Sequence, residues 1–135
     1  MKTTELAVAP LTGDVALDAT HQALYAELWR IATLPRAAFD DAFHTAVALL
    51  ERDFRQEEEM MERMAFPGLL PHREQHARAL AGLHHAAAAL AEGDERPARH
   101  AMSLLLDWLT LHIGTMDFAL AAACRRARGP RAADM

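Results

Sequence analysis

Apolar residues recur along most of this chain at alternating steps of three and four positions. One series begins Phe43, Ala46, Leu50, which places its members on one face of an α-helix. Three other segments show the same spacing, and no stretch shows the alternation that is typical of a β-strand. The pattern therefore predicts four helices, at about residues 18–34, 36–64, 71–91 and 97–128.

Residues that begin or end helices separate these segments. Asp18 is the expected N-cap of the first helix, and Pro35 follows its end. Pro97 suits the first turn of the last helix, and Gly129 lies just beyond its end. Short loops between four helices make sequence neighbours antiparallel, so we expect an all-α, up-down-up-down antiparallel four-helix bundle.

The length of the chain indicates a single domain. With 135 residues it is long enough to bury its own core. We expect the bundle to occupy residues 18–128, with an N-terminal lead-in at 1–17 and a C-terminal tail at 129–135.

Polar side chains interrupt the apolar face of every predicted helix. Four are histidines and three are carboxylates: His21, Asp53, Glu57, His72, His76, His112 and Asp117. Burying that many polar groups costs free energy unless each one finds a partner. Imidazole and carboxylate donors suit iron, manganese or zinc, so a metal centre is the simplest common explanation.

The spacing of these residues supports shared ligation only in part. His72 and His76 are four residues apart, so their side chains lie about 6 Å apart on one helix face. His112 and Asp117 are five residues apart, which is about 140° of an ideal helix, so both cannot point straight inward. Each motif alone has a structural reading, such as a hydrogen-bonded core histidine. Their coincidence on inward faces favours a metal.

Charge and composition argue against several other classes of protein. A net charge of −5 argues against a nucleic acid as the main partner. The sequence contains no run of about 18 apolar residues, so it predicts no membrane span. The N-terminal residues lack the pattern of a signal peptide. The single cysteine excludes an intrachain disulfide. We therefore expect a cytoplasmic protein, and nothing in the sequence requires more than a monomer.

At these positions the chain resembles the hemerythrin family, over about residues 18 to 120. Four motifs carry the resemblance: Asp18-x-x-His21, Asp53-Phe54-x-x-Glu57-Glu58, Phe66-Pro67 followed by His72-x-x-x-His76, and Trp108-Leu109-x-x-His112-Ile113-x-x-x-Asp117. The second motif differs from the family pattern at one position, because the family has histidine where this chain has Asp53.

The resemblance implies a non-haem diiron centre with an oxo or hydroxo bridge, which binds dioxygen reversibly. It assigns the ligands of the two irons as follows: His72, His76 and His112 on one iron, His21 on the other, and Glu57 and Asp117 bridging both. The family's second histidine on the His21 iron would lie at position 53.

Asp53 leaves three possibilities open. It could be a ligand itself, it could leave an open position on that iron, or the second ion could bind weakly or not at all. As a ligand, an anionic oxygen donor would favour the higher-valent ion. We would then expect a centre that autoxidises more readily and carries oxygen less well.

Two other functions compete with oxygen carriage, storage or sensing. One is a diiron oxidase or peroxidase, although such bundles usually supply Glu-x-x-His pairs from two helices, and Glu74 has no histidine three residues later. The other is a structural or regulatory bundle with a degenerate or zinc-occupied site. On balance we expect an oxygen-binding protein rather than an enzyme, with iron as the metal and manganese or zinc as alternatives.

Overall fold

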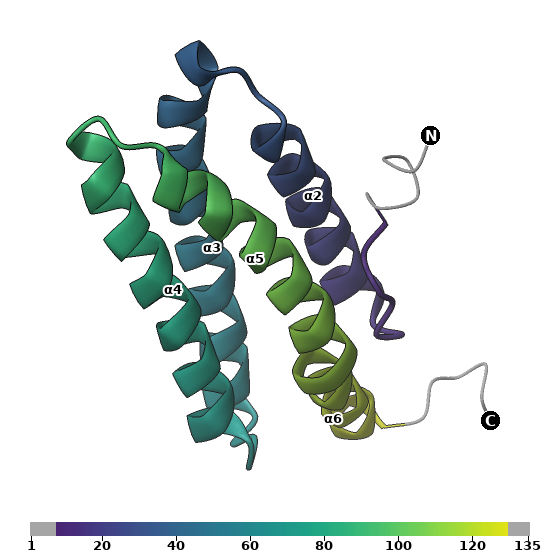
Figure 1. The fold of residues 1–135 in the computed structure, drawn as a ribbon. Helices are drawn as coiled ribbons and strands as arrows, with labels where there is room; N and C mark the ends of the chain where they lie inside the picture. Colours follow the sequence, from purple (N-terminus) through teal and green to yellow (C-terminus); the bar gives the residue numbers. More distant parts are fainter. Residues whose placement is uncertain (1–7, 130–135) are drawn as a thin grey trace.

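The computed structural model describes residues 8–129, and residues 1–7 and 130–135 of the predicted lead-in and tail lie outside the described residues. All of its regular elements are helical: α2 (Val15–Ala32), α3 (Arg36–Arg63), α4 (Leu69–Ala91), α5 (Arg96–His112), the π-helical turn η1 (Ile113–Asp117) and α6 (Phe118–Arg128). Successive long helices run in alternating directions (Figure 1). Each packs against the next, and α5 closes the ring by packing against α2. The predicted all-α four-helix bundle is confirmed.

The first helix begins earlier than the sequence pattern predicts. Asp14 is its N-cap, and the Asp14 carboxylate accepts a hydrogen bond of 3.0 Å from the backbone N–H of Leu17. Asp18, the predicted cap, lies inside the first turn instead. Its carboxylate reaches back and accepts bonds from the backbone N–H and hydroxyl of Thr12, at 2.8 and 2.7 Å. The prediction of Asp18 as the cap is therefore wrong, because a second acidic residue four positions earlier satisfies the helix terminus.

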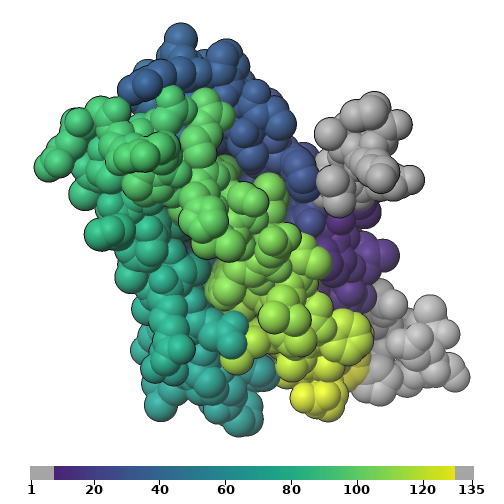
Figure 2. Space-filling model, in the orientation of Figure 1, coloured from purple at the N-terminus to yellow at the C-terminus, as the bar shows by residue number. Residues whose placement is uncertain are grey.

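The core follows the predicted apolar faces. Its largest fully buried side chains include Leu28, Ile31, Phe39, Phe43 and Leu50. Side chains of neighbouring helices fill the spaces between the ribbons (Figure 2). Each such side chain contributes about 1.5–3 kcal/mol through removal of its apolar surface from water. Because this packing fixes the helices on both sides, polar groups on the same faces are held in the bundle interior.

The last long helix contains one irregular turn. Between α5 and α6, residues Ile113–Asp117 form a π-helical turn, in which backbone N–H groups bond to carbonyls five residues earlier. The helix continues without a loop on either side of this turn. Such turns occur mostly as single insertions in α-helices and often lie at functional sites.

The same helix carries a long apolar stretch. Over Arg96–Arg128 it is long and apolar enough to cross a membrane, judged by length and composition alone. However, 44% of its most apolar window is buried inside the bundle, and His112 and Asp117 are buried on it. Core helices of bundles share this apolar character, so one such helix is weak evidence for a membrane span.

Candidate metal centre

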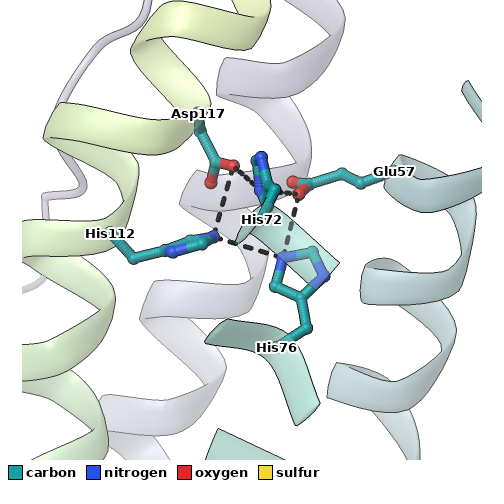
Figure 3. Close-up of side chains that lie close together, drawn as sticks. All are labelled: Glu57, His72, His76, His112 and Asp117. Atoms are coloured by element: carbon teal, nitrogen blue, oxygen red, sulfur yellow. Dashed lines mark hydrogen bonds and ion pairs between the residues drawn. The ribbon is translucent and has the colours of Figure 1, made fainter. Parts of the chain in front are cut away.

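Five of the seven predicted site residues form one buried cluster near the end of the bundle where α3 ends and α4 begins. They are Glu57, His72, His76, His112 and Asp117, and each offers one ligand atom within 4.8 Å of all the others. Figure 3 shows their side chains pointing toward a common centre from three different helices. Each residue is at most 8% exposed. The structure thus brings together groups that are up to 60 positions apart in the sequence.

Local helix geometry explains how each ligand reaches this centre. His72 and His76 are one turn apart on α4, and Glu57 lies on the inner face of α3. His112 ends α5, and Asp117 ends the π-helical turn η1. Because a π turn closes over five residues, it returns Asp117 to nearly the same face as His112. This turn resolves the 140° separation that an ideal α-helix would impose.

The two carboxylates each face both sides of the centre. Glu57 places Oε1 at 3.3 Å from Nε2 of His72 and Oε2 at 3.2 Å from Nε2 of His21. Asp117 places Oδ1 at 3.0 Å from Nε2 of His72 and Oδ2 at 3.1 Å from Nε2 of His21. His21 therefore adjoins the five-residue cluster through the second oxygen of both carboxylates.

The donor atoms of the cluster fit a metal better than they fit one another. Oε1 of Glu57, Nε2 of His72 and Oδ1 of Asp117 are buried and form no hydrogen bond of acceptable geometry among the described residues. Such orphaned polar groups are costly unless a further partner satisfies them. Nε2 of His72 lies 3.3 Å from Oε1 of Glu57 and 3.0 Å from Oδ1 of Asp117, so one cation between the three atoms would satisfy all of them.

Two neighbouring histidines strengthen this conclusion. Nδ1 of His76 donates to the carboxylate of Glu58, and Nδ1 of His112 donates to the amide oxygen of Gln75, each at 2.9 Å. In the neutral tautomer that these bonds select, both Nε2 atoms carry lone pairs, yet they lie only 3.2 Å apart. Two facing lone pairs repel unless a proton or a cation lies between them. Hydrogen bonds of this kind orient metal-bound imidazoles in proteins.

The electrostatics of the cluster are those of a cation site. Burial lowers the pKa of His21, but its hydrogen bonds to Asp117 and Glu57 outweigh burial and raise the pKa to about 9. The same carboxylates raise the pKa of His72 to about 9 against the effect of burial. Burial alone would raise the pKa of Glu57, yet the surrounding imidazoles lower it to about 2. Without a metal, protons on the imidazoles balance the two carboxylates, and a bound cation would replace those protons.

Asp53 does not join the cluster. It is buried on α3, one turn before Glu57, but its Oδ1 accepts hydrogen bonds from the guanidinium of Arg52 at 3.1 and 3.2 Å. Among residues 8–129, the group of converging ligand atoms does not include those of Asp53. A shared helix face therefore does not bring Asp53 to the centre, since its side chain pairs with the adjacent arginine.

Aromatic rings support the histidines in a way that sequence reasoning only partly anticipated. Phe54 stacks on His76 with ring centroids 3.9 Å apart, and Trp108 stacks on His112 at 4.5 Å. Trp108 belongs to the fourth sequence motif, and its stacking on His112 makes it a support for a ligand. Glu58 and Gln75 were missed, although each is the immediate sequence neighbour of a ligand.

The remaining histidines lie away from this centre. His44, His84, His85 and His100 are all exposed. Among them, His84 pairs with Glu51 at 3.0 Å on the surface. The buried and exposed histidines thus form separate groups.

Comparison with known proteins places this chain in a family. It is similar to the bacteriohemerythrin of Ralstonia nicotianae, with 33% identity over 105 residues that cover 78% of this chain and 77% of that protein. No family model matches the chain, and no solved structure matches it. The identity extends over most of both chains, and the four-helix bundle with its buried histidine and carboxylate cluster agrees with it. The chain belongs to the hemerythrin family.

Proposed function

We propose that the cluster holds two iron ions and reversibly binds dioxygen or a related small diatomic or peroxide ligand. The observation that carries this proposal is the division of each carboxylate, with one oxygen facing His72 and the other facing His21. A carboxylate placed in this way is suited to bridging two ions, and pairs of ions in proteins lie about 3.5–4 Å apart. Membership of the hemerythrin family supports iron as the metal and dioxygen as the ligand.

The chain would hold the two ions unequally. His72, His76 and His112 would bind one ion, together with one oxygen from each carboxylate. The other ion would have His21 and the second oxygens of Glu57 and Asp117. Fewer protein ligands leave the His21 position open, as in metal sites that admit a substrate or water. We therefore place the small ligand on the His21 side.

The surrounding residues would orient the ligands and exclude water. When bound, a pair of ferrous ions would supply the electrons that reversible dioxygen uptake requires. Glu58 and Gln75 hold His76 and His112 in the tautomer that presents Nε2 inward. The rings of Phe54 and Trp108 cover these imidazoles, which limits water access and strengthens the electrostatic interactions inside the site.

Metal analysis combined with visible spectroscopy tests this function. The protein is loaded anaerobically with ferrous iron, desalted and analysed, and its spectrum is then followed as dioxygen is added and removed. We expect about two irons per chain and a spectral change that reverses with dioxygen. Retention of one iron or fewer would contradict the two-ion proposal. An irreversible change would favour an oxidase or peroxidase instead.

A histidine variant identifies the side on which the small ligand binds. His21→Ala should reduce retained iron from about two ions to about one per chain and abolish the reversible spectral change. His85→Ala is a matched control, because it removes an exposed imidazole from α4 and should change neither quantity. Full dioxygen response in His21→Ala would show that the His21 side is not where the small ligand binds.

A further inference from the structure

Three sulfur atoms meet on the side of the bundle where α6 packs against the end of α3. Sγ of Cys124 lies 3.8 Å from Sδ of Met60 and 3.9 Å from Sδ of Met64. Met60 lies in the last turn of α3 and Met64, four residues later, is the C-cap of that helix, so both reach the same neighbour on α6. The three side chains together form what we call the sulfur triad.

The setting of the triad combines a buried thiol with an accessible edge. Cys124 is buried in a small apolar cluster with Leu17, Met61 and Leu120, while Met60 and Met64 are only partly buried and pack at its border. An ion could therefore approach past the two thioethers and reach the thiol. Both thioether sulfurs lie within hydrogen-bond distance of the thiol sulfur, so a cation that replaced the thiol hydrogen would lie close to all three sulfurs.

We propose that Cys124, Met60 and Met64 bind one monovalent copper ion. Thiolate and thioether sulfurs are soft donors that favour Cu(I) over the harder ions bound by carboxylates. With metal–sulfur bonds of about 2.3 Å, a planar arrangement of three sulfurs separates them from one another by about 4 Å. The two separations that involve Sγ of Cys124, 3.8 and 3.9 Å, match two of the three sulfur–sulfur distances in this arrangement.

Charge balance favours a monovalent ion at this position. One thiolate and one Cu(I) ion form a neutral unit, which a mostly apolar surrounding tolerates better than a net charge. Binding transfers the thiol proton to solvent, and no oxidation or reduction takes place. A divalent ion would add a net positive charge near Arg125 and Arg128, which together with Asp14 interact electrostatically with Cys124. Zinc is further disfavoured because two of the three donors are thioethers, and the ligands that zinc takes in proteins are thiolate, imidazole and carboxylate.

The sulfur triad is separate from the histidine and carboxylate centre. None of its three residues contributes to the converging ligand atoms of that centre, and its donors differ in chemical type. The proposal therefore does not depend on whether the other centre holds iron or binds dioxygen.

Anaerobic competition for Cu(I) tests the proposal. The iron-loaded protein is titrated into the Cu(I) complex of bicinchoninate, a coloured chelator, and loss of colour measures copper transfer. We expect one Cu(I) per chain to be removed from the chelator. X-ray absorption of the product should show only sulfur neighbours, at about 2.3 Å. Failure to compete, or copper with nitrogen and oxygen neighbours, would overturn the proposal.

Matched variants test whether the sulfur triad is the site that binds Cu(I). Cys124→Ser and the double variant Met60→Leu/Met64→Leu should each weaken Cu(I) binding by at least about 100-fold, because each removes direct ligands. Met61→Leu is the control, since it removes a thioether from the same apolar cluster and leaves all three sulfur atoms of the triad in place. Leucine replaces methionine with little loss of stability, so the double variant remains folded. Unchanged copper affinity in the triad variants would overturn the proposal.

Discussion

The metal centre has two sides: the three-histidine side, formed by His72, His76 and His112, and the His21 side. The protein holds the ligands of the first side more firmly than those of the second. On one side, His76 and His112 each have an outer hydrogen bond and a stacked aromatic ring. On the other side, His21 meets the two carboxylates through Nε2, while its buried Nδ1 has no hydrogen-bond partner among residues 8–129. The first side is preorganised, and the second depends on a single imidazole.

The side with more protein ligands is therefore also the side whose ligands are better held in place by their neighbours. An imidazole that is held by an outer partner loses less freedom when it binds a metal, and its basicity rises. The three-histidine side therefore should bind metal first and most tightly. The His21 side should bind its ion more weakly, and the bridging carboxylates make that second ion depend on the first.

The largest effect should come from breaking the bridge between the sides. Asp117→Asn keeps the shape of the side chain but removes the charge that faces both His72 and His21. We expect loss of both ions, with retained metal falling from about two per chain to near zero, as measured by elemental analysis after desalting. If one ion were retained at full affinity, Asp117 would not be shared between the two sides.

The pH dependence of metal binding should be nearly as large. His21 and His72 have pKa values of about 9, and a metal binds only the neutral imidazole. Protons therefore compete below pH 9, and metal affinity should rise with pH up to that value. Each displaced proton should contribute about tenfold per pH unit between pH 6 and 8.

Competition with a chelator of known affinity at several pH values measures this dependence. His21→Ala should lower its slope by one proton, since it removes one of the two raised pKa values. A slope that is the same in His21→Ala and in the unmodified protein would contradict the proton competition at His21.

Removing the outer hydrogen bonds should have a smaller effect that is confined to one side. Gln75→Met deletes the acceptor for Nδ1 of His112 while keeping a similar volume. We expect a loss of metal affinity on the order of 10–100-fold for the three-histidine side, measured by chelator competition at the first equivalent. Gln56→Met, at an exposed position on α3, is the control and should leave the affinity unchanged.

The smallest effect should come from Asp53→Asn. The carboxylate of Asp53 pairs with Arg52 and stays outside the cluster, so metal content should change by less than about twofold. Asp53→His instead places an imidazole one turn before Glu57 and should increase retention of the second ion. Loss of that ion in Asp53→Asn would identify Asp53 as a ligand after all.

The fold could be predicted from the sequence because the helices bury continuous apolar faces. A spacing of three and four residues places Leu28, Phe43 and Leu50 inward. This placement does not depend on where each helix begins or ends. The start of α2 was predicted incorrectly, because Asp14 and Asp18 are both plausible caps and only the contacts of the preceding loop distinguish them.

The site was less predictable where it departs from regular geometry. Histidine pairs one turn apart follow from the helical period, whereas the position of Asp117 depends on a π turn that the spacing does not reveal. Asp53 shares a helix face with Glu57, yet a local contact with Arg52 decides where its side chain points. The partners Glu58 and Gln75 become visible only when helices are packed together.

The π-helical turn also determines which residues of the following helix face the interior of the bundle. It accommodates one residue more than an α-helical turn, and one residue corresponds to about 100° of rotation. The inward face of α6, with Leu120 and Cys124, is aligned for that extra residue. Deleting one residue within Ile113–Asp117 would therefore rotate the last helix as well as displace a ligand. In a relative, a single-residue gap at this place would mark a bundle that has lost this centre and has had to repack its C-terminal helix.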